Sequence, residues 1–340
     1  MNPSVRSAFV FTGAALVLAG CKRDAAEPEE LDAPFALELP PGFPDVPVPE
    51  DNPLTEARVR LGKLLFFDER LSQGQGIACA SCHFTDRAFS DTVARSRGAG
   101  GALGLRNAQP LFNLAWHTGY FRDGGVPSLE LQALAPIHDE REMNSDLIEV
   151  ATALRAEEPY DTLSARGFGR ELDGYVITRA LAAYQRTLIS GWSRYDAALN
   201  GDATALNEQE QRGRDLFMSA ELGCNGCHGG FDLSDHSYRN VGYPSDLDAD
   251  PGRQRITLDP SDRGKFKVPS LRNVALTAPY MHDGGLATLE EVVAHFNSGG
   301  NADPNKDPLM HPLGLTPQQQ ADLIAFLRAL TDERTLDQVP

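Results

Sequence analysis

Residues 79–83 read Cys79-Ala80-Ser81-Cys82-His83, and the same spacing returns at Cys224-Asn225-Gly226-Cys227-His228. C-x-x-C-H is the attachment signature of a c-type haem, in which two thiols bond to the haem vinyl groups and the adjacent His ligates the iron. A zinc knuckle would need further Cys or His at ligand spacing. A redox dithiol or a disulfide pair would not need His in both copies. The sequence therefore predicts two covalent haem c groups, attached at Cys79, Cys82, Cys224 and Cys227 and ligated by His83 and His228.

Composition sets the outer bounds. The chain has 340 residues, enough for two domains, and 41% of them are hydrophobic, enough for a core in each. Of five Cys, four lie in the two motifs and the fifth is Cys21, so none remains for a structural disulfide. The net charge of −17 argues against a nucleic-acid partner. It suits a basic soluble partner, or it simply keeps the protein soluble.

The N-terminal residues 1–21 are typical of an export signal. Arg6 supplies a positive charge, and the apolar run from Ala8 to Leu18 is short for a membrane span. Leu18-Ala19-Gly20-Cys21 resembles a bacterial lipobox, which predicts a lipid anchor at Cys21 on the periplasmic side of a membrane. Simple cleavage and an uncleaved anchor are the alternatives. Residues 22–53 hold eight prolines and many acidic residues, which predicts a semi-extended tether.

Helical spacing predominates after residue 54, and alternating strand patterns are scarce. Two capping boxes, Thr288-Leu289-Glu290-Glu291 and Thr316-Pro317-Gln318-Gln319, mark helix starts. The predicted fold class is all-α with long loops, with helices at residues 58–67, 128–134, 145–157, 171–189, 207–220, 288–296 and 316–330.

Short stretches also repeat in order. GKLLF at 62–66 returns as GRDLF at 213–217, LRN at 105–107 returns at 271–273, and DGG at 123–125 returns at 283–285. This repetition predicts two c-type-cytochrome-like haem domains related by internal duplication. The predicted boundary near Asn200-Gly201 gives an N-terminal domain at 54–200 and a C-terminal domain at 201–335.

Two such modules in this order resemble the bacterial di-haem cytochrome c peroxidase and MauG-like family. The resemblance runs from about Leu54 to Leu330. Beyond the haem motifs it is carried by RNAQPLFNLAW at 106–116, DGGVPSLELQALAPI at 123–137, EREM at 140–143 and KVPSLRNVALTAPYMHDGG at 267–285. In that family one haem reacts with peroxide and the other relays electrons. The resemblance assigns these roles to the first and second haem, respectively.

Gln132 and Glu142 match the family's polar pair over the peroxide-reacting haem. Glu142 would move a proton between the two peroxide oxygens, which suits a carboxylate whose pKa is raised by burial. A solvated helix-surface Glu is the alternative. Pro136 matches the family's residue over the same iron, and Ala99 stands where many members have a movable His that blocks it. Because Ala cannot ligate, the first haem is expected to be five-coordinate or water-bound without reductive activation.

The sequence departs from the family at two further positions. Arg122 stands where the family has a Trp between the haems, which puts the usual electron route in doubt. An ion pair to a haem propionate or to Asp123 is the alternative role for Arg122. Phe296 stands where the second haem has a Met or Tyr sixth ligand, and Phe cannot ligate iron. Met281 or His295 is the expected substitute, with His282, Met310 or an open site left as alternatives.

The resemblance also implies a calcium ion between the haems. Asn107 matches its side-chain ligand, and the carbonyls of Lys267 and Pro269 match its backbone ligands. Asn107 could instead hold a turn. The remaining histidines are expected to be surface or structural residues: His117, His138, His236 and His311.

The leading functional interpretation is a peroxidase that reduces hydrogen peroxide with electrons from a small cytochrome c or copper protein. A MauG-like oxidase that modifies a residue of a partner protein is the second. A non-enzymatic electron-transfer or haem-sensing lipoprotein is the third. The electron donor and the oligomeric state, including a homodimer, are left open.

Overall fold

The computed structural model describes Met1 and residues 30–334, and it divides into the units Met1–Glu30 and Leu31–Pro340. The predicted export signal with Cys21 and the first residues of the predicted tether lie outside the described residues. All helices and strands among the described residues belong to the second unit. No helix among these residues is long and apolar enough to cross a membrane.

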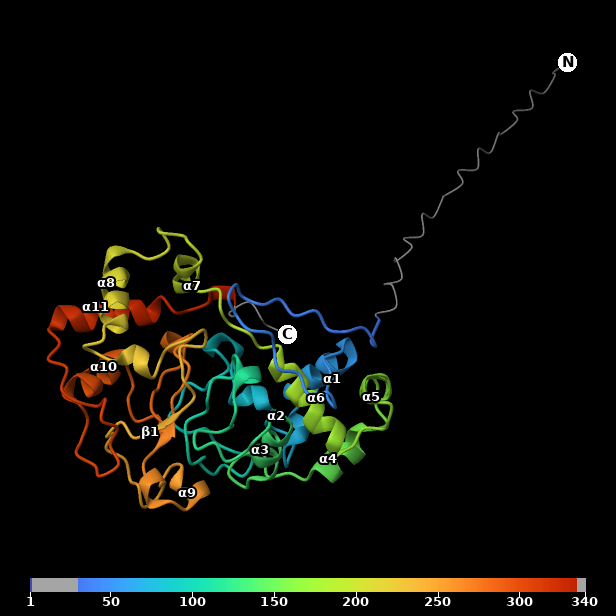
Figure 1. Ribbon diagram of the computed structural model, residues 1–340. Coiled ribbons are helices and arrows are strands. Elements are labelled where there is room, and N and C mark those ends of the chain that lie inside the picture. Colours follow the sequence, from blue (N-terminus) through green and yellow to red (C-terminus); the bar gives the residue numbers. More distant parts are fainter. Residues whose placement is uncertain (2–29, 335–340) are drawn as a thin grey trace. The chain divides into compact units, whose positions relative to one another are not determined.

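The described chain is mostly helical with long loops (Figure 1). The first half contains α1 (Glu56–Phe66), α2 (Leu129–Gln132), α3 (Leu134–His138), α4 (Leu147–Leu154), α5 (Tyr160–Phe168) and α6 (Gly174–Arg186). The second half contains α7 (Arg194–Leu199), α8 (Glu208–Met218), α9 (Gln254–Thr257), α10 (Leu289–Ser298) and α11 (Pro317–Arg328). Two short strands, β1 (Tyr238–Arg239) and β2 (Phe266–Lys267), pair antiparallel, so the described fold is not purely helical.

The helix starts follow local capping chemistry. Both predicted capping boxes are confirmed. The hydroxyl oxygens of Thr288 and Thr316 each accept a hydrogen bond from the backbone N–H of the residue three positions later in the chain. The predicted helix at 145–157 is wrong at both ends. Asp146, not Ser145, caps α4 because its carboxylate accepts from two backbone amides, and α4 ends at Leu154. Likewise α6 begins after Asp173, which caps it.

Each half packs its first long helix against its last, α1 against α6 and α8 against α11 (Figure 1). A glycine makes each close approach possible. A Cβ at Gly62 would lie 1.9 Å from the Ala180 carbonyl oxygen, and a Cβ at Gly213 would lie 1.9 Å from the Asp322 carbonyl oxygen. A separate hydrophobic cluster surrounds each helix pair.

Residues 31–53, predicted as part of a tether, instead pack on the folded body. The Phe35 amide donates to the Leu54 carbonyl at 3.1 Å. The Phe43 ring packs edge-on against Trp116 of the first half and Phe231 of the second. The apolar residues between the prolines attach this segment to the core.

We predict that Gly62→Ala destabilises the protein. Alanine favours a helix over glycine by about 1 kcal/mol, but a methyl group 1.9 Å from a carbonyl oxygen forces the two helices apart. Overpacking of this kind costs about 1–3 kcal/mol, so the melting temperature followed by circular dichroism should fall.

The matched control is Gly76→Ala, because a Cβ there meets no atom within 4 Å. Its melting temperature should stay within error of the wild type. An unchanged melting temperature for Gly62→Ala would contradict the close approach of α1 and α6.

Candidate functional site

The first C-x-x-C-H motif forms one 3-10 turn at Cys79–Ser81, which places both thiols and the His ring together. The His83 amide donates to the Cys79 carbonyl at 3.0 Å. Nδ1 of His83 lies 2.7 Å from the Phe89 carbonyl oxygen, so Nδ1 carries the proton and Nε2 presents its lone pair. Burial lowers the pKa of His83, which keeps the ring neutral. This is the state that ligates iron.

The second motif repeats this arrangement around the turn Cys224–Gly226. Nδ1 of His228 lies 3.2 Å from the Leu233 carbonyl oxygen, which again leaves Nε2 free for a metal. His228 and both cysteines line a cavity of about 460 Å³, together with apolar residues such as Phe217 and Leu222. That volume is typical of a cofactor pocket. Among the described residues the four motif thiols form no disulfide. Each motif offers two thiols beside an imidazole that burial keeps neutral, and these are the groups that hold a covalent haem. The residues at both sites therefore fit this cofactor.

Glu142 lies beside the first motif. The loop residue Ala99 donates its amide to the Glu142 carbonyl at 2.7 Å. Burial raises the pKa of the Cys79 thiol to about 12, and the charge of Glu142 adds a smaller increase. The pKa of Glu142 itself is raised to about 7, first by desolvation and then by the neighbouring Asp139. Although Glu142 keeps an exposed face, its carboxylate has the raised pKa that the sequence interpretation required.

The other predicted pocket residues come from the two short helices before Glu142. Gln132 ends α2, and Pro136 lies within α3. Both are half-buried. The Met143 amide donates to the Pro136 carbonyl at 3.0 Å, which ties α3 to the turn that carries Glu142.

The side chain of Asn107 is hydrogen-bonded to a positively charged residue of the same chain. The Arg122 guanidinium donates to the Asn107 Oδ1 at 2.8 Å. Arg122 is not paired with Asp123, whose carboxylate accepts from Arg106 and Arg255. Burial, with the nearby charge of Arg106, lowers the pKa of Arg122 to about 10. The oxygen predicted to bind calcium is therefore already engaged by a buried cation. This arrangement does not fit a calcium ion beside it.

The predicted sixth ligands of the second haem differ in position. Met281 lines the cavity of His228, as does Phe296 on α10. His295 is not among the residues that line this cavity, and its Nε2 lies 3.0 Å from the Val241 carbonyl oxygen. His282 also lines the cavity, but its ring stacks on Phe266 at 3.8 Å.

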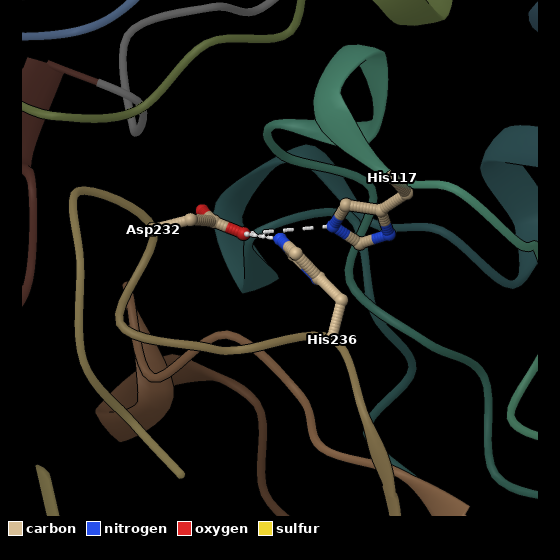
Figure 2. A group of neighbouring side chains, drawn as sticks. All are labelled: His117, Asp232 and His236. Atoms are coloured by element: carbon tan, nitrogen blue, oxygen red, sulfur yellow. Dashed lines mark ion pairs between the residues drawn. The ribbon is translucent and has the colours of Figure 1, made fainter. Parts of the chain in front are cut away.

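His117 and His236, expected from the sequence to be surface or structural residues, both lie against the buried carboxylate of Asp232 (Figure 2). His117 lies more than a hundred residues before the other two. Within the sequence, only Asp232 and His236 are near each other, four residues apart. Such a pair is too common to indicate a metal or catalytic site.

Comparisons with known proteins agree with this arrangement. Residues 56–204 match the family profile "Di-haem cytochrome c peroxidase", and residues 210–331 match "Cytochrome c". The chain is 38% identical to the methylamine utilization protein MauG of Methylorubrum extorquens, over 87% of this chain and 85% of that protein. It is 33% identical to the cytochrome c551 peroxidase of Pseudomonas aeruginosa, over 86% of each.

A solved structure is also similar, that of a MauG-like protein associated with microbial copper homeostasis. Its TM-score is 0.85 at 37% identity, and the match covers 89% of this chain and 97% of that chain. Similarity of this extent covers both haem motifs and the segments between them. The chain therefore belongs to the di-haem cytochrome c peroxidase family and is a di-haem c-type oxidoreductase.

Proposed function

We propose that this chain reduces hydrogen peroxide to water at the first haem site, with electrons that enter from a small redox protein through the second. The observation that carries the proposal is the carboxyl of Glu142 beside the first motif, with a pKa of about 7. A group with this pKa accepts and returns a proton equally well at neutral pH. That capacity is what cleavage of the O–O bond requires.

The haem iron, when bound, supplies the redox chemistry, and the chain supplies binding and proton transfer. With the haem bound, Glu142 would take a proton from one peroxide oxygen and deliver it to the other, so that the O–O bond can break with water as the leaving group. Gln132 supplies an amide that orients the peroxide. Ala99 would leave the iron accessible, because its methyl group cannot bind a metal.

The second site serves electron transfer in this proposal. We favour Met281 over His295 as the sixth ligand, because Met281 lines the cavity and His295 does not. A Met ligand gives a higher potential than a His ligand would, which suits electron entry from a small cytochrome c or copper protein. The net charge of −17 would attract a basic donor.

We also infer that the two halves, 54–200 and 201–335, are copies of one haem module. The matching glycine contacts of α1 with α6 and α8 with α11 support this inference. Export with a lipid anchor at Cys21 remains part of the proposal and rests on the sequence alone.

We infer further that the chain holds its halves together without calcium. The guanidinium of Arg122 bonds to Asn107 where the ion was expected. The backbone carbonyl of Arg122 accepts from the Lys267 amide at 2.7 Å, which joins the two halves directly. A divalent ion beside this buried cation would meet strong repulsion.

A second candidate function is oxidation of a residue on a partner protein, as in a MauG-like oxidase. Ala99 favours it, because the first site needs no prior reduction to become open. The similar structure of a MauG-like protein supports it as well. Rapid mixing with peroxide separates the two functions. A peroxidase returns to its starting spectrum with turnover of reduced cytochrome c, whereas a protein-modifying oxidase holds a long-lived oxidised spectrum without that turnover.

We predict that Glu142→Gln slows the reaction with peroxide by about 100-fold or more, because general acid–base catalysis contributes about 10²–10⁴-fold. In the wild type, the protonated carboxyl cannot accept a proton, so the rate should rise with pH through about 7. In the variant this rise should disappear. Stopped-flow absorbance between pH 5 and 9 measures both effects.

Glu140→Gln is the matched control, since it removes one carboxylate two residues away on the exposed surface. It should keep both the rate and the rise near pH 7. If Glu142→Gln retained the pH-dependent rise, another group would be the proton acceptor.

We predict that neither EDTA nor added calcium changes the melting temperature or the haem spectra of the holoprotein. The physical reason is the guanidinium of Arg122 at Asn107. Differential scanning calorimetry measures this with chelator and with about 1 mM calcium. That concentration is near the dissociation constant of the weakest calcium sites in proteins. A rise in melting temperature that saturates with calcium would contradict the replacement of the ion by Arg122.

A further inference from the structure

Three side chains that the proposed peroxide chemistry does not use converge on one buried point, where the two halves meet (Figure 2). His117 comes from the first half, just after the turn Leu114–Trp116. Asp232 and His236 come from the loop that follows the second haem motif. One nitrogen or oxygen from each of the three lies within 4.8 Å of the other two.

The spacing of these atoms suits a metal ion. Oδ2 of Asp232 lies 3.6 Å from Nε2 of His117 and 3.4 Å from Nε2 of His236. Tetrahedral ligands at about 2.0–2.1 Å from a zinc ion lie about 3.4 Å from one another. The two edges at Asp232 match this value, and the ligand nitrogens of the two histidines lie within 4.8 Å of each other.

The buried polar atoms of the cluster are left unsatisfied. In the part of the chain that the structure describes, neither Nε2 of His117 nor Oδ2 of Asp232 has a hydrogen-bond partner. The side chains of Asp232 and His117 are only 1% and 8% exposed. A buried carboxylate oxygen without a donor is costly, and both orphaned atoms point into the same space (Figure 2). A cation between them would satisfy both.

The surrounding groups orient the three side chains. The other carboxylate oxygen of Asp232, Oδ1, accepts a hydrogen bond from the side-chain Nδ2 of Asn113 at 2.8 Å. Nδ1 of His117 lies 3.0 Å from the Lys267 Nζ, which itself donates to the Gly119 carbonyl at 2.8 Å. These contacts turn Oδ2 of Asp232 and Nε2 of His117 toward each other. A charged Lys267 can only donate, so Nδ1 of His117 accepts and the ring proton lies on Nε2, facing Oδ2 of Asp232. A metal ion at Nε2 would displace that proton to solvent, and Nδ1 would then take a proton from Lys267 and donate it back in a hydrogen bond to Nζ. Burial also lowers the pKa of both histidines, which leaves their rings neutral.

We propose that His117, Asp232 and His236 form a binding site for a divalent first-row transition metal such as Zn²⁺ or Cu²⁺. Two imidazole nitrogens and one carboxylate oxygen are ligands that these ions prefer over calcium or magnesium. Because His117 belongs to the first half and the other two to the second, the ion cross-links the halves. Three protein ligands supply all but one position of a tetrahedral site.

The test uses the full-length holoprotein without a histidine tag. After treatment with a chelator, the protein is titrated with ZnCl₂, and bound zinc is counted by mass spectrometry of the dialysed protein. We expect about one zinc per chain and a rise in melting temperature, because a ligand that binds only the folded state stabilises it. In Asp232→Asn and His236→Gln, we expect zinc affinity at least about tenfold weaker and no rise in melting temperature.

His138→Gln, which removes an exposed histidine outside the cluster, is the matched control and should bind zinc as the wild type does. Two cluster variants guard against a folding defect in one, and the haem absorbance spectrum reports whether each has folded. Equal zinc binding by the wild type and both cluster variants, or no stoichiometric binding by the wild type, would overturn the proposal.

Discussion

Each haem site depends on one hydrogen bond between the Nδ1 of a histidine and a backbone carbonyl. For His83 the acceptor is Phe89, and for His228 it is Leu233. That bond selects the tautomer and the direction of the ring, because a ring that donates from Nδ1 presents its lone pair at Nε2. Covalent attachment through two cysteines would then place the iron opposite that lone pair. The helices of each half serve to hold this short turn in place.

Buried charged groups join the two halves. Asp123 is fully buried and accepts from Arg106 of its own half and Arg255 of the other. Arg106 reaches in turn to Asp250 of the second half. Removing one partner of such a buried pair is costly because the other charge stays buried. The relative position of the haem sites therefore rests on side-chain charges, with Arg122 and the His117 cluster in the same region.

Local chemistry could be predicted where neighbouring residues supply it. The capping boxes at Thr288 and Thr316 were found because donor and acceptor lie three residues apart. The start of α4 was misplaced by one residue because Ser145 and Asp146 are both good caps, and the choice depends on the backbone path. The tether was misjudged because composition reports a tendency to extend, whereas packing of Phe43 against Trp116 and Phe231 depends on distant segments.

By itself, the sequence determined which residues carry the haems, because attachment needs only thiols and an imidazole at a spacing of a few residues. Its resemblance to a family marked Glu142, but the pKa of about 7 follows from desolvation by surrounding groups and from the charge of Asp139, which only the folded chain brings to that carboxyl. Tertiary structure alone decided that Arg122 bonds to Asn107 and that His117 meets Asp232 and His236. These contacts join residues from distant parts of the chain, and no local pattern records which of them will meet.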